Sequence, residues 1–141
     1  MNNPLSNIEL RDKDGILYKL SLLKEESFSL ILLNSVSSLR DISHLDLLAK
    51  HFEELKSNKT SPIVIVSQPE SHLGKFLKKN KYSFPILSDP SSRISKILDC
   101  HIKKLKTSQR ATIIFEEKYK ERDRFIFMST PQKHLDFLLN N

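Results

Sequence analysis

Hydrophobic and polar positions follow two different periods along the chain, and each change of period marks a predicted element. Residues 28–33 and 63–66 are almost entirely apolar, which is typical of strands buried on both faces of a parallel sheet. Between them, apolar residues recur at steps of three and four from Leu39 to Leu55, which predicts one long helix ending near residues 57–58. A strand, a helix and a strand in this order predict a right-handed βαβ unit.

The segment before this unit has the pattern of a β-hairpin. Residues 8–11 alternate between apolar and polar side chains, as a half-buried strand does, and residues 16–20 are predicted to form the returning strand. Asp14-Gly15 lies between them, and this dipeptide favours a tight turn because glycine accepts positive φ. We therefore expect two short antiparallel strands at the N-terminal end of the fold.

The second half of the chain continues with shorter elements. We first expect a helix capped by Ser71 with Leu73, Phe76 and Leu77 on one side, an extended piece over 84–87, and a helix with Ile94, Ile97 and Leu98 on one side. A basic loop over 103–109 should follow, and then two strands over 111–115 and 124–128 joined by a polar turn over 116–123. The final helix should start at Ser129-Thr130-Pro131.

Composition narrows the class of protein. A chain of 141 residues with 38% apolar and 28% charged residues suits a single globular domain over residues 1–141. Two glycines are too few for a glycine-rich phosphate loop. The longest apolar run, 30–33, is far shorter than the roughly 20 residues that span a bilayer, so we expect no membrane association. One cysteine and no secretory pattern predict a reducing, cytoplasmic location.

The order of these elements resembles the thioredoxin fold, and several short strings resemble the peroxiredoxin group, the alkyl hydroperoxide reductase and thiol-specific antioxidant (AhpC/TSA) proteins. The resemblance implies an α/β, thioredoxin-like fold in which a central mixed sheet carries an N-terminal β-hairpin and flanking helices. The strings that carry it are 8–15 (F-x-L-x-D-x-x-G in the family), 28–33 (first central strand), 63–67 (V-V-x-V-S), 84–89 (F-P-x-L-x-D) and 109–115 (R-x-T-F-x-I).

The chain departs from this family at the place where its chemistry resides. The family's reactive thiolate follows the first central strand, at the start of the long helix, where positive charge and the helix N-terminus activate it. Here residues 34–41 read Asn-Ser-Val-Ser-Ser-Leu-Arg-Asp, so the motif P-x-x-x-T-x-x-C is absent, and a Cys-x-x-Cys would fall near 36–39. We therefore expect a redox-inactive binding or regulatory module, and not an enzyme in the family's sense, since it lacks the required cysteine.

Two alternatives stay open. Cys100 could serve a peroxiredoxin or thiol-disulfide oxidoreductase, although free cysteines are usually buried and inert. The net charge of +6 could mark a basic nucleic-acid-binding domain, a reading that we favour less because acidic residues are interspersed among the basic ones. Apart from Cys100, we predict no catalytic residue.

Arg110 is the main candidate for binding, because in the resembled family the matching arginine lies beside the reactive thiolate. Together with Ser37, Ser38 and Arg40 it could form an anion pocket at the N-terminus of the first helix. We favour the simpler interpretation, in which Arg110 pairs with a carboxylate such as Asp41 or Glu116.

The histidines give no sign of a metal centre. There are five, at 44, 51, 72, 101 and 134, and no two have the i, i+4 spacing of a helical zinc site. We expect them to be solvated surface residues, and we expect neither a metal nor a cofactor. The partner would be a protein or a small anion, and the sheet edges leave room for a homodimer.

Overall fold

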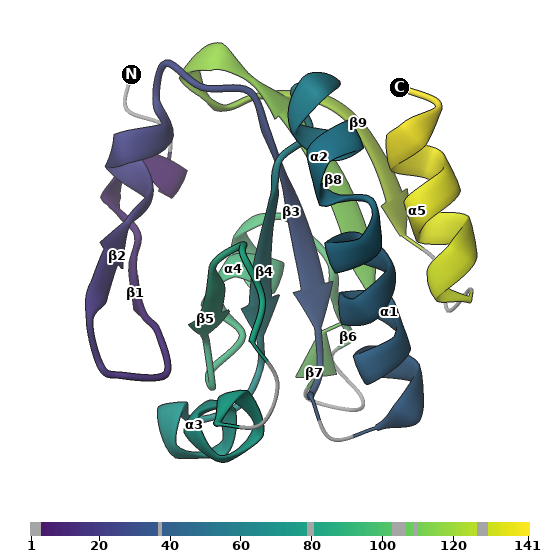
Figure 1. Cartoon of the computed structure of the whole chain (residues 1–141). Coiled ribbons are helices and arrows are strands. Elements are labelled where there is room, and N and C mark those ends of the chain that lie inside the picture. Colours follow the sequence, from purple (N-terminus) through teal and green to yellow (C-terminus); the bar gives the residue numbers. More distant parts are fainter. Residues whose placement is uncertain (1–3, 37, 79–80, 103–106, 109, 127–129) are drawn as a thin grey trace.

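The structure, a computed structural model, describes residues 4–36, 38–78, 81–102, 107–108, 110–126 and 130–141. At its centre is a seven-stranded sheet with the order β2-β1-β5-β4-β3-β8-β9 (Figure 1). Its strands are β1 Glu9–Arg11, β2 Leu17–Lys19, β3 Phe28–Leu33, β4 Pro62–Val66, β5 Ile86–Ser88, β8 Ala111–Glu116 and β9 Lys120–Ile126. A separate two-stranded sheet pairs β6 His101–Ile102 with β7 Thr107–Ser108.

Helices and short 3-10 segments surround this sheet. The α-helices are α1 Leu39–Lys50, α2 Phe52–Ser57, α3 Glu70–Leu77, α4 Arg93–Ile97 and α5 Pro131–Leu139, and the 3-10 segments are η1 Pro4–Asn7, η2 Leu20–Leu23 and η4 Glu117–Tyr119. In Figure 1, α1 and α5 lie side by side over the sheet, and the β1–β2 hairpin stands at its other end.

The central strands are apolar because both of their faces are covered. Every residue of β3 and of β4 is buried, and the two strands run parallel with Leu30 opposite Ile63. β8 pairs with β3 in the antiparallel direction, which makes the sheet mixed. The α/β, thioredoxin-like fold with an N-terminal hairpin is therefore confirmed.

The sheet separates two apolar clusters. One lies beneath η1, η2 and α4 and includes Leu20, Ile94 and Cys100; we call it the hairpin-side core. The other lies beneath α1, α2, α3 and α5 and includes Leu45 and Leu135; we call it the helix-side core. Successive residues of a strand point to opposite faces, so each central strand contributes to both cores.

The predicted long helix is wrong in one respect, because the structure divides it at His51 into α1 and α2. The His51 backbone has φ −107° and ψ 16°, outside the helical range, yet it accepts a hydrogen bond from Leu55 N at 3.0 Å. Leu39 was expected on the buried face but is 86% exposed, because it is the first residue of α1.

Three other boundaries differ from expectation. Ser71 does not cap α3, because the helix begins at Glu70 and its N-cap is Pro69. β9 begins at Lys120, within the segment expected to be a turn, and Tyr119 in that segment is buried. Of the expected basic loop, residues 107–108 form β7, whereas 103–106 and 109 lie outside the described residues, as do 127–129.

Tyr119 links two distant parts of the chain. Its hydroxyl donates a hydrogen bond to the Leu20 carbonyl at 2.6 Å, across a sequence separation of 99 residues. Its ring packs edge-on against Phe28 with 6.5 Å between centroids. Lys118 and Tyr119 both have positive φ, at 61° and 59°, a conformation that non-glycine residues rarely adopt. The contacts of Tyr119 therefore hold this turn against the start of the sheet.

Candidate functional site

The first turn of α1 is organised around a carboxylate, Asp41. Ser38 is the N-cap, and its Oγ accepts a hydrogen bond from the Asp41 backbone N–H at 3.1 Å. In return, the Ser38 hydroxyl donates to Asp41 Oδ2 at 2.6 Å, and the Ser35 hydroxyl donates to the same oxygen at 3.1 Å. This reciprocal cap fixes the carboxylate at the helix N-terminus, where negative charge is favoured.

Arg110, next to a neighbouring strand, forms an ion pair with Asp41. It lies just before β8, and its Nη2 donates to Asp41 Oδ1. The side chains of Arg110 and Asp41 are only 11% and 9% exposed, so this is a nearly buried ion pair. Its energy depends on good geometry, because burying two charges carries a desolvation cost. The simpler interpretation of Arg110, pairing with Asp41, is therefore confirmed.

His44 lies one turn further along α1 and shares the same arginine. Arg110 Nη1 lies 2.7 Å from His44 Nδ1. A guanidinium can only donate, so Nδ1 accepts and the ring proton resides on Nε2. Burial lowers the pKa of His44 well below its usual 6.5, and the charges of Arg110 and His134 lower it further. His44 is therefore neutral at physiological pH, and its Nε2 has no hydrogen-bond partner among the described residues.

A second histidine connects this group to α5. The ring centroids of His44 and His134 are 5.4 Å apart, and His134 Nδ1 lies 3.0 Å from the Thr112 hydroxyl on β8. Phe125 packs edge-on against the His134 ring at 4.7 Å. We call Asp41, His44, Arg110, Thr112 and His134 the buried polar cluster. It joins α1, β8 and α5 on the helix side of the sheet.

The expectation of surface histidines is thus wrong for two of the five. His44 and His134 are both 0% exposed. The sequence contained a signal for this: each precedes a buried leucine by four positions, Leu48 and Leu138, which is the spacing of one helical face. Among the described residues no group of three His, Cys, Asp or Glu side chains could hold a metal ion.

The four candidate anion-binding residues fall into different surroundings. Ser38 and Arg110 both contact Asp41, Arg40 is exposed, and Ser37 lies outside the described residues. The negative group that Ser38 and Arg110 hold is therefore the chain's own carboxylate. Binding of an external anion by these residues stays a prediction.

Residues 38–41 share one spacing with the family's cysteine pattern, which was not among the predictions from sequence. In the pattern P-x-x-x-T-x-x-C the cysteine follows a hydroxyl residue by three positions. Ser38-Leu39-Arg40-Asp41 keeps that spacing, with a serine hydroxyl first and a carboxylate in the cysteine's place. Chemically, this carboxylate can stabilise a helix N-terminus and neutralise an arginine, but it is a far poorer nucleophile than a thiolate.

Cys100 lies on the opposite side of the sheet, in the hairpin-side core. It is 1% exposed, and its Sγ is 3.4 Å from the Leu98 carbonyl oxygen. It follows α4 rather than ending it. Arg124 Nη1 comes within 3.8 Å of the sulfur, but both Nε and Nη2 of Arg124 donate to the Glu121 carboxylate. Burial raises the pKa of the Cys100 thiol despite the nearby Arg124 charge.

Comparison with known proteins agrees with this fold. Peroxidoxin BcpB from Mycobacterium tuberculosis is 19% identical with a TM-score of 0.84, covering 94% of this chain and 89% of its own. A cysteine-to-serine mutant of PrxQ from Xylella fastidiosa is 13% identical with a TM-score of 0.85, covering 99% and 91%. The exposed lipoprotein thioredoxin Etrx1 from Streptococcus pneumoniae is 21% identical with a TM-score of 0.65, covering 95% and 98%. A search of curated proteins finds no match.

The mixed sheet and its flanking helices define a peroxiredoxin-like, thioredoxin-fold protein. The sequence itself matches the AhpC/TSA family over residues 1–123. The chain therefore belongs to the AhpC/TSA family. Within the described residues, no helix is both long and apolar enough to cross a membrane.

Proposed function

We propose that this chain is a redox-inactive member of the AhpC/TSA family that acts as a binding or regulatory module. The observation that carries the proposal is the ion pair of Asp41 and Arg110 at the start of α1. A reactive thiolate depends on unneutralised positive charge nearby. Here a carboxylate of the chain takes up that charge, at the spacing where the family pattern has its cysteine.

Cys100 is poorly suited to take over the missing chemistry. The thiolate is the reactive form of cysteine, and burial raises the pKa of this thiol. Its sulfur is enclosed in the hairpin-side core, and the cation described beside it, Arg124, is paired with Glu121. These features favour a structural role for Cys100 over the alternative of a single-thiol peroxidase.

We further propose a protein, rather than a small anion, as the partner. An anion at the start of α1 would have to displace Asp41, which already accepts from Ser35, Ser38 and Arg110. That internal carboxylate has an advantage over any free ion, because the chain holds it in place and no binding entropy is lost. A second copy of the chain is one such protein partner.

Peroxide consumption tests the loss of redox function. The wild-type protein and Cys100→Ser are incubated with hydrogen peroxide and, separately, with an organic hydroperoxide, in the presence of dithiothreitol. We expect both proteins to match the rate of a buffer blank. Consumption by the wild type that disappears in Cys100→Ser would overturn the proposal in favour of a single-thiol enzyme.

A further inference from the structure

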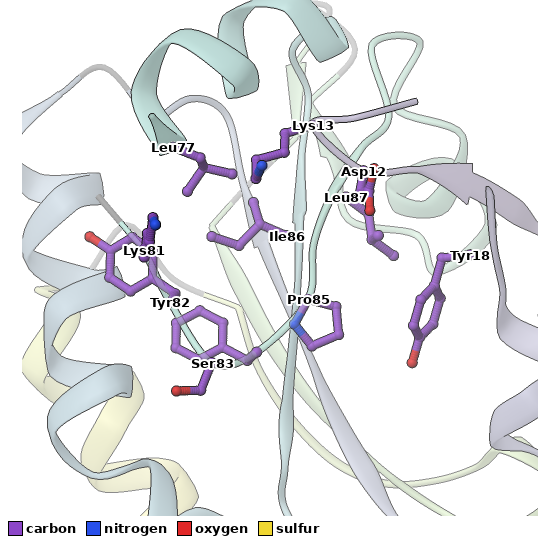
Figure 2. Close-up of a pocket in the computed structure, with 11 residues that line it drawn as sticks. Asp12, Lys13, Tyr18, Leu77, Lys81, Tyr82, Ser83, Pro85, Ile86 and Leu87 are labelled. Atoms are coloured by element: carbon purple, nitrogen blue, oxygen red, sulfur yellow. The ribbon is translucent and has the colours of Figure 1, made fainter. Parts of the chain in front are cut away.

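A groove lies between the β1–β2 hairpin and the strand β5, away from the buried polar cluster. Its volume is about 520 Å³. Its lining includes Lys13 and Tyr18 of the hairpin, Lys81 and Tyr82 before β5, and Ile86 of β5 itself. Figure 2 shows Ile86 between Lys13 and Lys81, with Tyr18 on the far side of Pro85. The groove therefore has an apolar and aromatic body and two ammonium groups.

Within the part of the chain that the structure describes, the edge of β5 that borders this groove is largely unpaired. β1 pairs with β5 at a single position, Arg11 opposite Ser88. On the other edge, Pro85 accepts from Val64 N at 3.0 Å and Asp89 donates to Val66 O at 2.8 Å. Residues 85, 87 and 89 thus direct their backbone groups towards β4. Successive residues of a strand direct these groups to opposite edges, so the N–H and C=O of Ile86 point away from β4.

The Ile86 backbone N–H and C=O are consequently available for a further strand. The residue is only 5% exposed, and among the described residues neither group has a hydrogen-bond partner. Buried backbone groups are almost always paired in native proteins. An extended peptide laid along the groove would supply the missing donor and acceptor, as in other cases of strand addition to a sheet edge.

The charges around the groove indicate which peptide fits. Lys13 and Lys81 are both exposed. The acidic residue of the groove, Asp12, uses Oδ1 to accept from the backbone N–H groups of Asp14 and Ile16 at 2.8 and 3.0 Å. Lys13 contacts the exposed Asp14 at 3.0 Å, a surface pair that a ligand can exchange at little cost. Acidic side chains on the peptide would therefore be complementary to the groove.

We propose that this groove binds an extended, acidic segment of a partner protein, which pairs with the Ile86 backbone while its carboxylates face Lys13 and Lys81. This inference rests on the proposed binding function and names the surface and the chemistry of the partner. Apolar side chains that alternate with the acidic ones would all point to one face of the added strand, where they would lie against Tyr18 beside the hairpin-side core. The charges select the segment, and the sheet edge orients it.

The test uses two synthetic peptides, acetyl-Glu-Val-Glu-Val-Glu-amide and its counterpart with lysine in place of glutamate. Binding to the full-length protein is followed by backbone amide chemical shifts, and hydrogen exchange is measured at Ile86. We expect the acidic peptide to bind roughly tenfold or more tightly than the basic one. We also expect it to slow exchange of the Ile86 amide, because that N–H gains an acceptor.

Charge reversal gives the matched control. The double variant Lys13→Glu/Lys81→Glu should lose about tenfold in affinity for the acidic peptide. Lys24→Glu/Lys96→Glu makes the same change of net charge at exposed lysines that do not line the groove, and should bind like the wild type. If both double variants lose the same affinity for the acidic peptide, the effect comes from net charge alone, and the proposal is overturned.

Other results would also overturn it. Unchanged Ile86 exchange at saturating peptide would exclude strand addition, and equal binding of free glutamate would show a site for any carboxylate. A failure of this kind leaves the redox-inactive function standing, because peroxide consumption measures that separately. Peroxidase activity would in turn contradict the proposed function without changing the peptide result.

Discussion

Arg110 and Arg124 lie on opposite sides of the same sheet, and each pairs with a carboxylate in different surroundings. Arg110 and Asp41 are about one-tenth exposed, whereas Arg124 and Glu121 are 31% and 34% exposed. Arg110 stands at the helix start where the family pattern has its thiolate, and Arg124 stands beside the chain's only cysteine. In both places a carboxylate neutralises the cation that a reactive thiol would need.

The comparison shows how the site is filled in a chain that has no cysteine there. A buried arginine without a counter-charge would be strongly destabilising, so the site requires some anionic group. Asp41 supplies it and also completes the cap of α1. The position that holds the reactive cysteine in the family pattern holds a carboxylate here, and this carboxylate stabilises the fold.

The largest expected difference between the two ion pairs is in stability. Asp41→Asn leaves Arg110 nearly buried without a counter-charge and should lower the free energy of unfolding by about 3–5 kcal/mol. Glu121→Gln breaks the more exposed pair and should cost less than about 1 kcal/mol. Urea denaturation at neutral pH measures both, and equal losses would show that burial does not distinguish the two sites.

A second test turns the carboxylate site back into a thiol site. In a Cys100→Ser background, Asp41→Cys places a thiol at the N-terminus of α1 beside Arg110, and both features lower a thiol pKa. We expect alkylation by iodoacetamide near pH 6.5 to be roughly fiftyfold faster than for an ordinary surface thiol, because most of the sulfur would be thiolate.

Ser43→Cys in the same background is the control for this test. Ser43 is an exposed residue of α1, two positions beyond the cluster's carboxylate. Thermal melting of both variants establishes that they fold. If the two thiols react at the same rate, the environment of Asp41 does not favour an anion, and the comparison with the family's thiolate fails.

The smallest effect concerns His44 and pH. The folded-state pKa of His44 is lowered, mainly by burial, so the folded protein stays unprotonated at this ring when the unfolded chain takes up a proton. The contribution of His44 to the free energy of unfolding is fully present above the pKa of the unfolded chain, about 6.5. It is lost as pH falls below that value, by up to about 1.4 kcal/mol per pH unit, until the folded-state pKa is reached.

His44→Leu should remove this part of the pH dependence between about pH 6.5 and 5. The exposed His72→Gln, another single histidine replacement, serves as its control. Urea denaturation at a series of pH values gives the slope for each protein. If the slope of His44→Leu matches that of the wild type, His44 does not report the desolvated environment of the cluster.

The sequence predicted those elements whose periodicity reflects burial. β3 coincides with the expected 28–33 because an apolar run needs cover on both faces. β9 was recognised only in its last residues, because Lys120–Asp123 is exposed and charged, and an exposed edge strand has no apolar alternation. The break at His51 was missed because the apolar steps continue across it, from Leu48 to Leu55.

For the candidate site, the sequence predicted a pair but not the group around it. Asp41 was considered as the partner of Arg110, since a carboxylate near a strand-end arginine is the ordinary arrangement. His44 and His134 were placed at the surface, because histidine is polar and the apolar face was defined only by leucine, isoleucine and phenylalanine. The rings of His44 and His134 meet only because α1 packs against α5, and no local sequence pattern encodes that packing.

The Tyr119 link has a consequence for the order in which the chain can fold. Leu20 and Phe28 lie near the start of the sequence, yet they find their partner 99 and 91 residues later. During synthesis, the first βαβ unit can form while this partner is still missing. The hairpin-side core would therefore close only after β8 has emerged, so the N-terminal hairpin should be among the last parts to dock.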